Sequence, residues 1–160
     1  MLKFLPFVTP LVNMVEGVVD SCRDKVRPVE GSILYCDLAF GYAEHSGVYI
    51  GDGRIVHLNG QGKVEVVSPS EFIEGTTAMN IYVSCRNEYA VGCDFTADRA
   101  RQAIHDKRNY NVLIDNCHQF SAGCITGDFE NSSNMLRLLK YECETYFRAN
   151  AWRQWDIDLF

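Results

Sequence analysis

Apolar and polar residues alternate with a period of two through much of the first half of the chain, as they do in half-buried β-strands. The alternation predicts strands at residues 31–38, 45–50, 54–58, 63–67 and 79–85. Short links join the first four segments, which is typical of antiparallel strands that follow one another in a meander. We therefore expect an antiparallel sheet at the centre of the fold.

Between and after these strands the pattern changes to helical spacing. Residues 68–72 predict a turn or a short helical piece, and a longer helix is expected from Thr96 to about Asn109. Asn116 has the side chain of a helix cap, and Gly127 is the residue type expected just past a helix end. A further helix is therefore predicted between Asn116 and Gly127.

Two apolar stripes predict helices near the ends of the chain. The last helix is expected to begin at Ser132 or Ser133 and to bury Leu136, Leu139, Cys143 and Phe147. The first stripe consists of Leu11, Met14, Val15, Val18, Val19 and Cys22. Its helix either docks on the core of the domain or is an amphipathic helix that contacts a membrane or a lipid substrate. Its polar face lacks the Lys and Arg excess of membrane-surface helices.

The apolar N-terminal segment has neither the pattern of a signal peptide nor that of a membrane span. The run is interrupted by Pro6, Pro10, Asn13 and Glu16, and no site with small residues suited to cleavage follows it. An uninterrupted run of about 20 apolar residues would be needed to cross a bilayer as a helix. We therefore treat residues 1–27 as an extension of the domain.

Composition restricts the classes of function. The 160 residues are 47% apolar, which suits one compact domain with a real core. The net charge is -6 and the Lys and Arg residues are scattered, which argues against a nucleic-acid partner because binding a polyanion requires clustered cations.

The seven cysteines indicate a reducing environment. Their number is odd, their spacing is wide and no CxxC pair occurs, so the pattern fits neither a disulfide framework nor a zinc ribbon. We expect a cytoplasmic protein, with peripheral contact to a membrane through residues 1–25 as a further expectation. The oligomeric state is left open by the sequence.

Cys117 combines a nucleophilic side chain with a favourable position. It follows the predicted cap Asn116 and so occupies the first helical position, where unpaired backbone N–H groups and the helix dipole favour a thiolate. A nucleophilic thiol also needs an imidazole nearby. His118 projects about 100° away on the same helix, and His105 belongs to a charged segment that is expected to be solvated.

The hairpin around Gly51-Asp52-Gly53 decides whether the remaining two imidazoles, His45 and His57, can share a site. A two-residue loop would place them on opposite faces of the sheet. A three-residue loop, with Gly53 in the left-handed position of a G1 bulge, would make them diagonal neighbours on one face, roughly 7–8 Å apart at Cα. We favour the three-residue loop because such a loop requires glycine at its third position.

The three residues Cys117, His45 and His57 have less specific interpretations as well. A buried cysteine is usually an inert small apolar residue, and a histidine on a strand is usually satisfied by the backbone. The same three side chains plus water would also make a catalytic zinc site, although the short-range ligand pairing that is typical of zinc sites is absent.

Three stretches together resemble a known family: "EHSGVYIGDGRIVHL", "VEVVSPSEFIEG" and "NVLIDNCHQFSAGCITGD". They are similar to the lecithin:retinol acyltransferase-like (LRAT-like) proteins, a circularly permuted branch of the NlpC/P60, papain-like superfamily. The resemblance runs from about Val29 to Ser133. It implies an α+β papain-like fold with an antiparallel β-meander packed on helices. Residues 28–160 would form the catalytic domain, preceded by an extra N-terminal helix.

The resemblance also implies a chemistry. Cys117 would be the nucleophile, His45 the general base and His57 the residue that orients the imidazole, with the Cys117 backbone and Asn116 supporting the oxyanion. The expected function is a cysteine-dependent acyltransferase or lipase-type hydrolase that acts through a thioester on ester or amide bonds of lipids or acylated small molecules. No cofactor and no metal are expected. The alternatives are a cysteine peptidase or amidase of the NlpC/P60 type and a non-catalytic binding module.

Two features depart from the family pattern. The family motif reads Asn-Cys-Glu-His-Phe, whereas His118 and Gln119 stand here in place of Glu-His. Family members that act on membranes often carry a C-terminal hydrophobic anchor. The C-terminal sequence here, "AWRQWDIDLF", is too short and too charged to span a membrane. Its aromatic residues Trp152, Trp155 and Phe160 are interpreted as core or lid residues.

Overall fold

The computed structural model describes residues 23–108 and 116–160. The strands are β1 (Ile33–Asp37), β2 (Glu44–Tyr49), β3 (Ile55–Leu58), β4 (Val64–Val67), β5 (Tyr82–Arg86), β6 (Tyr89–Ala90) and β7 (Ala151–Gln154). The helices are α2 (Pro69–Ile73), α3 (Asp94–Gln102), α4 (Cys117–Thr126) and α5 (Leu136–Phe147). The helix expected from the first apolar stripe lies outside the described residues.

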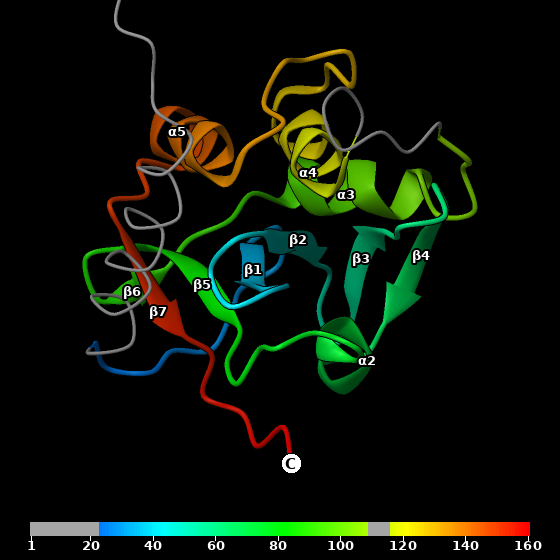
Figure 1. Cartoon of the computed structure of the whole chain (residues 1–160). Helices are drawn as coiled ribbons and strands as arrows, with labels where there is room; N and C mark the ends of the chain where they lie inside the picture. Colours follow the sequence, from blue (N-terminus) through cyan, green and yellow to red (C-terminus); the bar gives the residue numbers. More distant parts are fainter. Residues whose placement is uncertain (1–22, 109–115) are drawn as a thin grey trace, which may run out of the picture.

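All pairings between these strands are antiparallel, in the order β4-β3-β2-β1-β5-β6, and β7 pairs with β5 (Figure 1). The four strands predicted as a meander are neighbours in the sheet, so this prediction is confirmed. The central strand β1 is buried on both faces: Ile33 and Tyr35 belong to one apolar cluster, and Leu34 and Cys36 to another.

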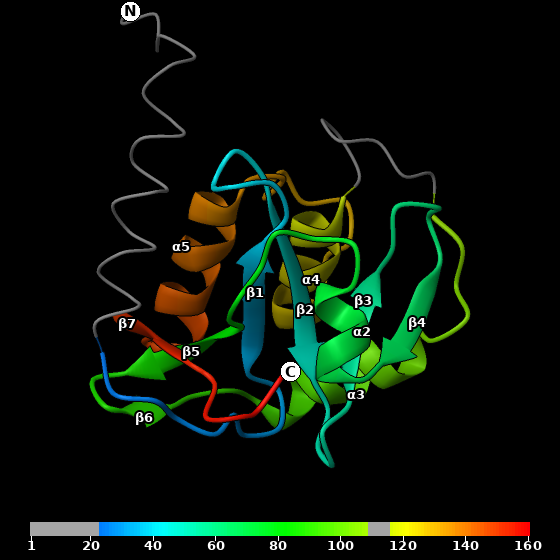
Figure 2. The same ribbon diagram turned by 60° about the horizontal axis from the view of Figure 1, so that its bottom comes forward.

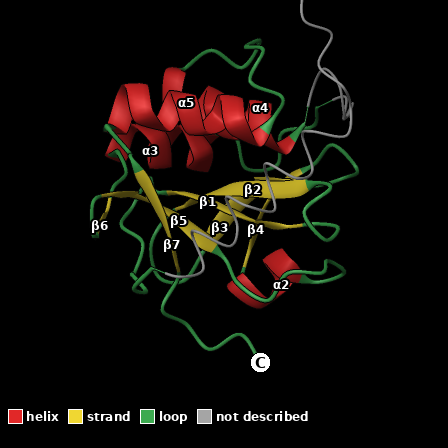
Figure 3. Ribbon diagram, turned by 60° about the vertical axis from the view of Figure 1, so that its left-hand side comes forward, coloured by secondary structure: helices red, strands yellow, loops and turns green. Residues whose placement is uncertain are grey.

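Helices cover both faces of the sheet unequally. The three longer helices α3, α4 and α5 lie on one face, and the short α2 lies on the other (Figure 3). α4 packs on β2 and β3 and is flanked by α3 and α5 (Figure 2). The expected α+β architecture, with an antiparallel meander packed on helices, is confirmed.

Among the described helices α4 is the most enclosed, and its ends are well defined by the sequence. Every residue from Cys117 to Ile125 is buried, as expected of a helix that lacks a polar face. The Asn116 side chain caps the first turn, and Gly127 ends the helix in the left-handed conformation with φ 83°. The predicted bounds of this helix are confirmed.

Two predicted helix boundaries are wrong. α3 begins earlier, at Asp94, and ends at Gln102 instead of near Asn109. After α3 the chain turns back to the sheet, because backbone hydrogen bonds join His105 N to Val64 O and Val64 N to Asp106 O, both at 3.0 Å. These tertiary hydrogen bonds end the helix despite the helical spacing of the sequence.

The start of α5 also differs from the prediction. The helix follows Met135, and neither Ser132 nor Ser133 caps it. Ser133 N instead donates to Asn131 Oδ1 at 2.9 Å, within a turn. The next residue, Asn134, accepts a hydrogen bond from Asn116, the cap residue of α4. The expected buried stripe is present, with Leu136, Leu139 and Cys143 buried and Phe147 partly buried against the same cluster.

The C-terminal segment adds a strand, β7, that the sequence pattern does not predict. Trp152 and Trp155 are buried in the two apolar clusters, as expected for core aromatics, whereas Phe160 is exposed. Val26 N donates to Gln154 O at 2.9 Å, so the described part of the N-terminal segment packs beside β7. Within residues 23–108 and 116–160, no helix has the length and apolar character needed to cross a bilayer.

Gly47 is predicted to be essential for the packing of β2 against β3 and α2. A Cβ atom at this position would lie 2.8 Å from Ile55 Cγ2, 3.0 Å from Val56 O and 3.1 Å from Phe72 Cε2. We expect Gly47→Ala to lower the free energy of unfolding in urea by roughly 1–3 kcal/mol, because a buried backbone must move to make room. Gly60→Ala is the control, since a Cβ there meets nothing within 4 Å. Equal stability of the two variants would contradict this account.

Candidate active site

The β2–β3 hairpin has the register that brings its two histidines together. Val48 pairs with Val56, which closes a three-residue loop as predicted. Gly53 has φ 68°, the left-handed conformation expected for it. Gly51 and Asp52 also have positive φ values, 91° and 50°, so the loop is not the type I turn of a G1 bulge. The predicted register is confirmed, although the loop reaches it with a different backbone conformation.

His45 and His57 are in direct contact on one face of the sheet. His45 Nε2 lies 2.6 Å from His57 Nδ1, and the ring centroids are 4.8 Å apart. Phe72 of α2 packs against both rings, at centroid distances of 4.8 Å and 5.7 Å. Because the Phe72 side chain is almost fully buried, it shields the contact between the imidazoles from water on that side.

Cys117 occupies the first position of α4, as expected, and is only 4% exposed. The Asn116 side-chain oxygen accepts hydrogen bonds from the backbone N–H groups of His118 and Gln119, at 2.9 Å and 3.1 Å. Cys117 Sγ lies 4.0 Å from Glu44 O, at the start of β2. The first turn of α4 therefore holds the sulfur beside the strand that carries His45.

The surroundings of Cys117 favour its thiolate. Burial acts to raise the pKa of the Cys117 thiol, but a hydrogen bond to His45 and the charge of that imidazole act against it, together with contacts to Ser46. The net result is a pKa below the usual value. Sulfur and imidazole are thus coupled, as they are in cysteine nucleophiles activated by histidine.

Burial keeps three of the other described cysteines in the unreactive thiol form. Burial raises the pKa of the thiols of Cys36, Cys124 and Cys143 far above the usual value. All six cysteines in the described part of the chain are free. Among the cysteines whose pKa is shifted, Cys117 alone is shifted toward the thiolate.

Glu65 extends the line of hydrogen bonds beyond the two histidines. It pairs with His57 across β3 and β4, and its Oε1 lies 3.2 Å from His57 Nε2. Asn59 Nδ2 donates to the same oxygen at 2.9 Å. Burial lowers the pKa of His57 despite the opposing effect of Glu65, so the contact joins a neutral imidazole to a carboxylate.

Glu65 is a site residue that the sequence pattern does not predict. The segment "KVEVV" was correctly predicted as a strand, but the register of β4 depends on the turn after Asn59, which closes through a hydrogen bond from Asn59 N to Lys63 O. Several loop lengths are compatible with this glycine-rich turn. The only available signal was an acidic residue on the strand next to that of His57.

The two residues that depart from the family motif make buried hydrogen bonds within the domain. His118 Nδ1 lies 2.9 Å from Ser46 Oγ, and Gln119 exchanges hydrogen bonds with Asn131. Both side chains are buried and connect α4 to its neighbours. As expected, His118 is not the imidazole whose charge lowers the pKa of Cys117.

Asn116 acts on the site through the helix that it caps. Its side-chain oxygen accepts the two backbone hydrogen bonds of the first turn, and its Nδ2 donates to Asn134 O at 2.7 Å. The amide side chain is therefore engaged on both sides. The backbone N–H of Cys117 lies in the first turn of the helix, where such groups have no intrahelical acceptor and can bind an anion.

The geometry of the imidazoles does not suit a shared metal ion. Two nitrogen ligands on one tetrahedral zinc ion would lie about 3.3 Å apart, because each bond is about 2.0–2.1 Å long. His45 Nε2 and His57 Nδ1 instead point at each other at 2.6 Å. Within the described part of the chain, no group of three or more His, Cys, Asp or Glu side chains is arranged to hold a metal ion.

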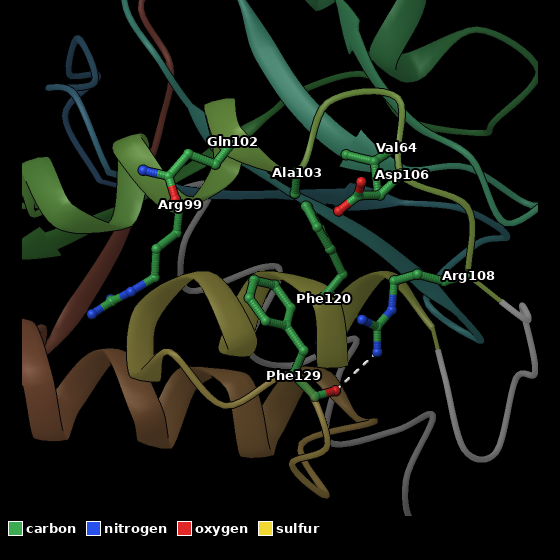
Figure 4. Close-up of a pocket in the computed structure, with 8 residues that line it drawn as sticks. All are labelled: Val64, Arg99, Gln102, Ala103, Asp106, Arg108, Phe120 and Phe129. Carbon is green, nitrogen blue, oxygen red and sulfur yellow. Dashed lines mark hydrogen bonds between the residues drawn. The ribbon is translucent and has the colours of Figure 1, made fainter.

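A separate hollow of about 230 Å³ is lined by residues of α3, of α4 and of the segments that follow these helices (Figure 4). Its lining includes Phe120, Phe129 and two arginines but none of the three candidate residues. Arg99 Nη1 donates to Cys124 O and Ile125 O at 3.0 Å and 2.9 Å, and Arg108 Nη2 donates to Phe129 O at 2.9 Å. Both guanidinium groups thus bind backbone carbonyls of the domain itself.

We predict that Cys117 reacts with iodoacetamide at pH 6 at least about tenfold faster than the other cysteines, because the thiolate is the reactive form. Removal of the imidazole by His45→Ala should abolish the preference, since the pKa of Cys117 then rises. His105→Ala is the control, because His105 is exposed and lies outside the site. Peptide mapping by mass spectrometry measures the labelling. Uniform labelling of the cysteines in the folded protein would contradict the prediction.

His118 is predicted to make folding sensitive to acid. Burial lowers its pKa to about 4 from 6.5, so below pH 6.5 the unfolded chain binds a proton that the folded chain does not. Between pH 7 and pH 4.5 the free energy of unfolding should therefore fall by roughly 2–3 kcal/mol more in the natural chain than in His118→Asn. Urea denaturation at both pH values measures the difference. Identical pH dependence of the two proteins would refute this assignment.

The comparisons with known proteins identify one family. The family model described as "Lecithin retinol acyltransferase" matches residues 27–130, a range that contains His45, His57 and Cys117. Among curated proteins, none matches the sequence. The family match covers more than half of the 160 residues and implies a papain-like fold with acyltransferase or hydrolase chemistry of the cysteine type. The chain therefore belongs to the lecithin retinol acyltransferase family.

Proposed function

We propose that the protein is a cysteine-dependent acyltransferase or lipase-type hydrolase that carries an acyl group on Cys117 as a thioester. The observation that supports this proposal most strongly is the coupling of the Cys117 thiol to His45, which is hydrogen-bonded to His57 at 2.6 Å. In this proposal Cys117 is the nucleophile, His45 is the general base and His57 orients the His45 ring.

The proposed reaction proceeds in two halves. His45 accepts the thiol proton, and Cys117 Sγ attacks the carbonyl carbon of an ester. The C–O bond to the leaving alcohol then breaks, and His45 returns the proton to that oxygen. The backbone N–H of Cys117 stabilises the oxyanion between these steps. In the second half, water, an alcohol or an amine attacks the thioester, gives its proton to His45 and releases the free thiol.

An apolar loop beside the site supports a lipid as the acyl donor. The loop between β1 and β2 leads directly to Glu44, whose carbonyl oxygen lies 4.0 Å from Cys117 Sγ. The loop between α2 and β5 contacts this loop, because Phe40 N donates to Thr77 Oγ1 at 2.8 Å. The exposed large apolar residues of the two loops are Leu38, Phe40, Tyr42 and Met79. Exposed apolar clusters commonly mark binding surfaces, and acyl chains are apolar ligands.

The thioester is the predicted species that tests the proposal. We expect intact mass spectrometry of the protein mixed with a short-chain phosphatidylcholine to show one acyl adduct, which hydroxylamine removes. Cys117→Ala should form none, and His45→Ala should form it at least roughly 100-fold more slowly because general base catalysis contributes factors of that size. Cys93→Ala is the matched control, since Cys93 caps α3 without a side-chain hydrogen bond.

Three results would contradict the proposal. One is an adduct that persists in Cys117→Ala, which would assign the reaction to another residue. Another is the absence of any adduct with phospholipid, combined with cleavage of N-acyl peptides that depends on Cys117. That combination would identify the protein as a cysteine peptidase or amidase. Failure of Cys117 to react with either substrate would favour the non-catalytic binding module.

A further inference from the structure

The hydrogen bonds at the outer end of the site have a defined direction, which begins at Asn59. Asn59 Oδ1 accepts hydrogen bonds from the backbone N–H groups of Gln61 and Lys63, at 2.9 Å and 3.0 Å. These two donors identify that atom as the amide oxygen. The other atom of the side chain, Nδ2, is therefore a donor, and it points at Glu65 Oε1 from 2.9 Å.

Glu65 is held as a carboxylate, which can only accept hydrogen bonds. The hydrogen bond from Asn59 lowers the pKa of Glu65, burial opposes this effect, and the hydrogen bond to His57 and the charges of His57 and Lys63 lower it further. The Glu65 side chain is 31% exposed, so the cost of keeping its charge is modest. An acceptor 3.2 Å from His57 Nε2 requires that this nitrogen carries hydrogen.

The direction of hydrogen bonding then passes through both rings. A neutral imidazole has one N–H group, so a hydrogen on His57 Nε2 leaves a lone pair on Nδ1. His45 Nε2, 2.6 Å away, must therefore be the donor in the contact between the two rings. The same reasoning leaves a lone pair on His45 Nδ1. This nitrogen is the one that remains for the thiol of Cys117.

We propose that Glu65 is a positioning residue that sets the tautomers of both imidazoles, so that His45 presents an unprotonated Nδ1 to Cys117. Without an acceptor beside Nε2, His57 can place its hydrogen on Nδ1 and donate to His45 instead. His45 then carries hydrogen on Nδ1 and cannot accept the thiol proton. The carboxylate also stabilises the imidazolium that forms when His45 takes that proton. The inference rests on the proposed function, in which His45 is the base.

Two substitutions separate the two contributions of Glu65. In Glu65→Gln, Asn59 Nδ2 still requires an oxygen at the Oε1 position, so the acceptor for His57 remains while the charge is lost. Glu65→Ala removes both the acceptor and the charge. Glu74→Gln is the control for charge, because Glu74 is exposed and lies just after α2. Thermal unfolding of each variant monitors the fold.

The tautomers are measured directly by NMR of protein labelled with ¹⁵N in histidine. The spectra are recorded above the titration range of the imidazoles, in a Cys117→Ser background that prevents transfer of the thiol proton. We expect His45 and His57 each to show a protonated Nε2 and an unprotonated Nδ1. Adding Glu65→Ala should move hydrogen onto Nδ1 of both rings. Adding Glu65→Gln or Glu74→Gln should leave the tautomers unchanged.

The kinetic readout is the rate at which iodoacetamide alkylates Cys117 at pH 7. With Cys117 present, we expect Glu65→Ala to slow alkylation by roughly 10- to 100-fold, less than the roughly 10⁴-fold lost when a carboxylate in direct contact with the base is replaced, because Glu65 acts on His45 through a second ring. Glu65→Gln should show a smaller loss, because it retains the acceptor, and Glu74→Gln should show none. Unchanged tautomers or an unchanged alkylation rate in a folded Glu65→Ala variant would overturn the inference.

Neither readout needs an acyl substrate, so this inference and the proposed function can fail separately. If the natural chain forms no thioester but Glu65→Ala shifts the tautomers and slows alkylation, the role of Glu65 stands and the acyl transfer fails. If acyl transfer and alkylation are the same in Glu65→Ala and in the natural chain, the function stands and the role of Glu65 is wrong.

Discussion

The hydrogen bond between His45 Nε2 and His57 Nδ1, 2.6 Å long, is the interaction on which the site depends. It forms only if both rings project from the same face of the sheet, and this condition fixes the register of β2 against β3. A loop of three residues sets that register. Phe72 of α2 then covers both rings, so one short helix shields a contact that the hairpin creates.

The proposed nucleophile, Cys117, begins α4, which is the most enclosed of the described helices. α4 is buried along nearly its whole length, and Asn116 both caps it and holds the following turn at Asn134. A helix fixed on all sides leaves little freedom for its first residue, Cys117. A catalytic site requires side chains that packing holds in place, and here the helix and the hairpin fix the candidate residues independently.

The sequence predicts the features that local chemistry determines. The short loop at Gly53 allows few registers, so the shared face of the two imidazoles follows from loop length. The cap at Asn116 likewise follows from residue type. In contrast, long-range hydrogen bonds to β4 decide where α3 ends, and the turn at Asn131 displaces the start of α5 from Ser133. Propensity alone cannot anticipate such contacts, and the position of Glu65 depends on one of these undetermined registers.

β4 is the outermost strand on its side of the described sheet, so its side chains lie at the edge of the sheet. The line of polar contacts runs from an enclosed sulfur to a carboxylate at the rim, where the side chain is partly exposed. In the role proposed for Glu65, an exchange at the rim alters the reactivity of the sulfur with little repacking, whereas exchanges at Phe72 disturb the interior. The reactivity of the sulfur and the stability of the core can therefore be altered separately by substitutions on different elements.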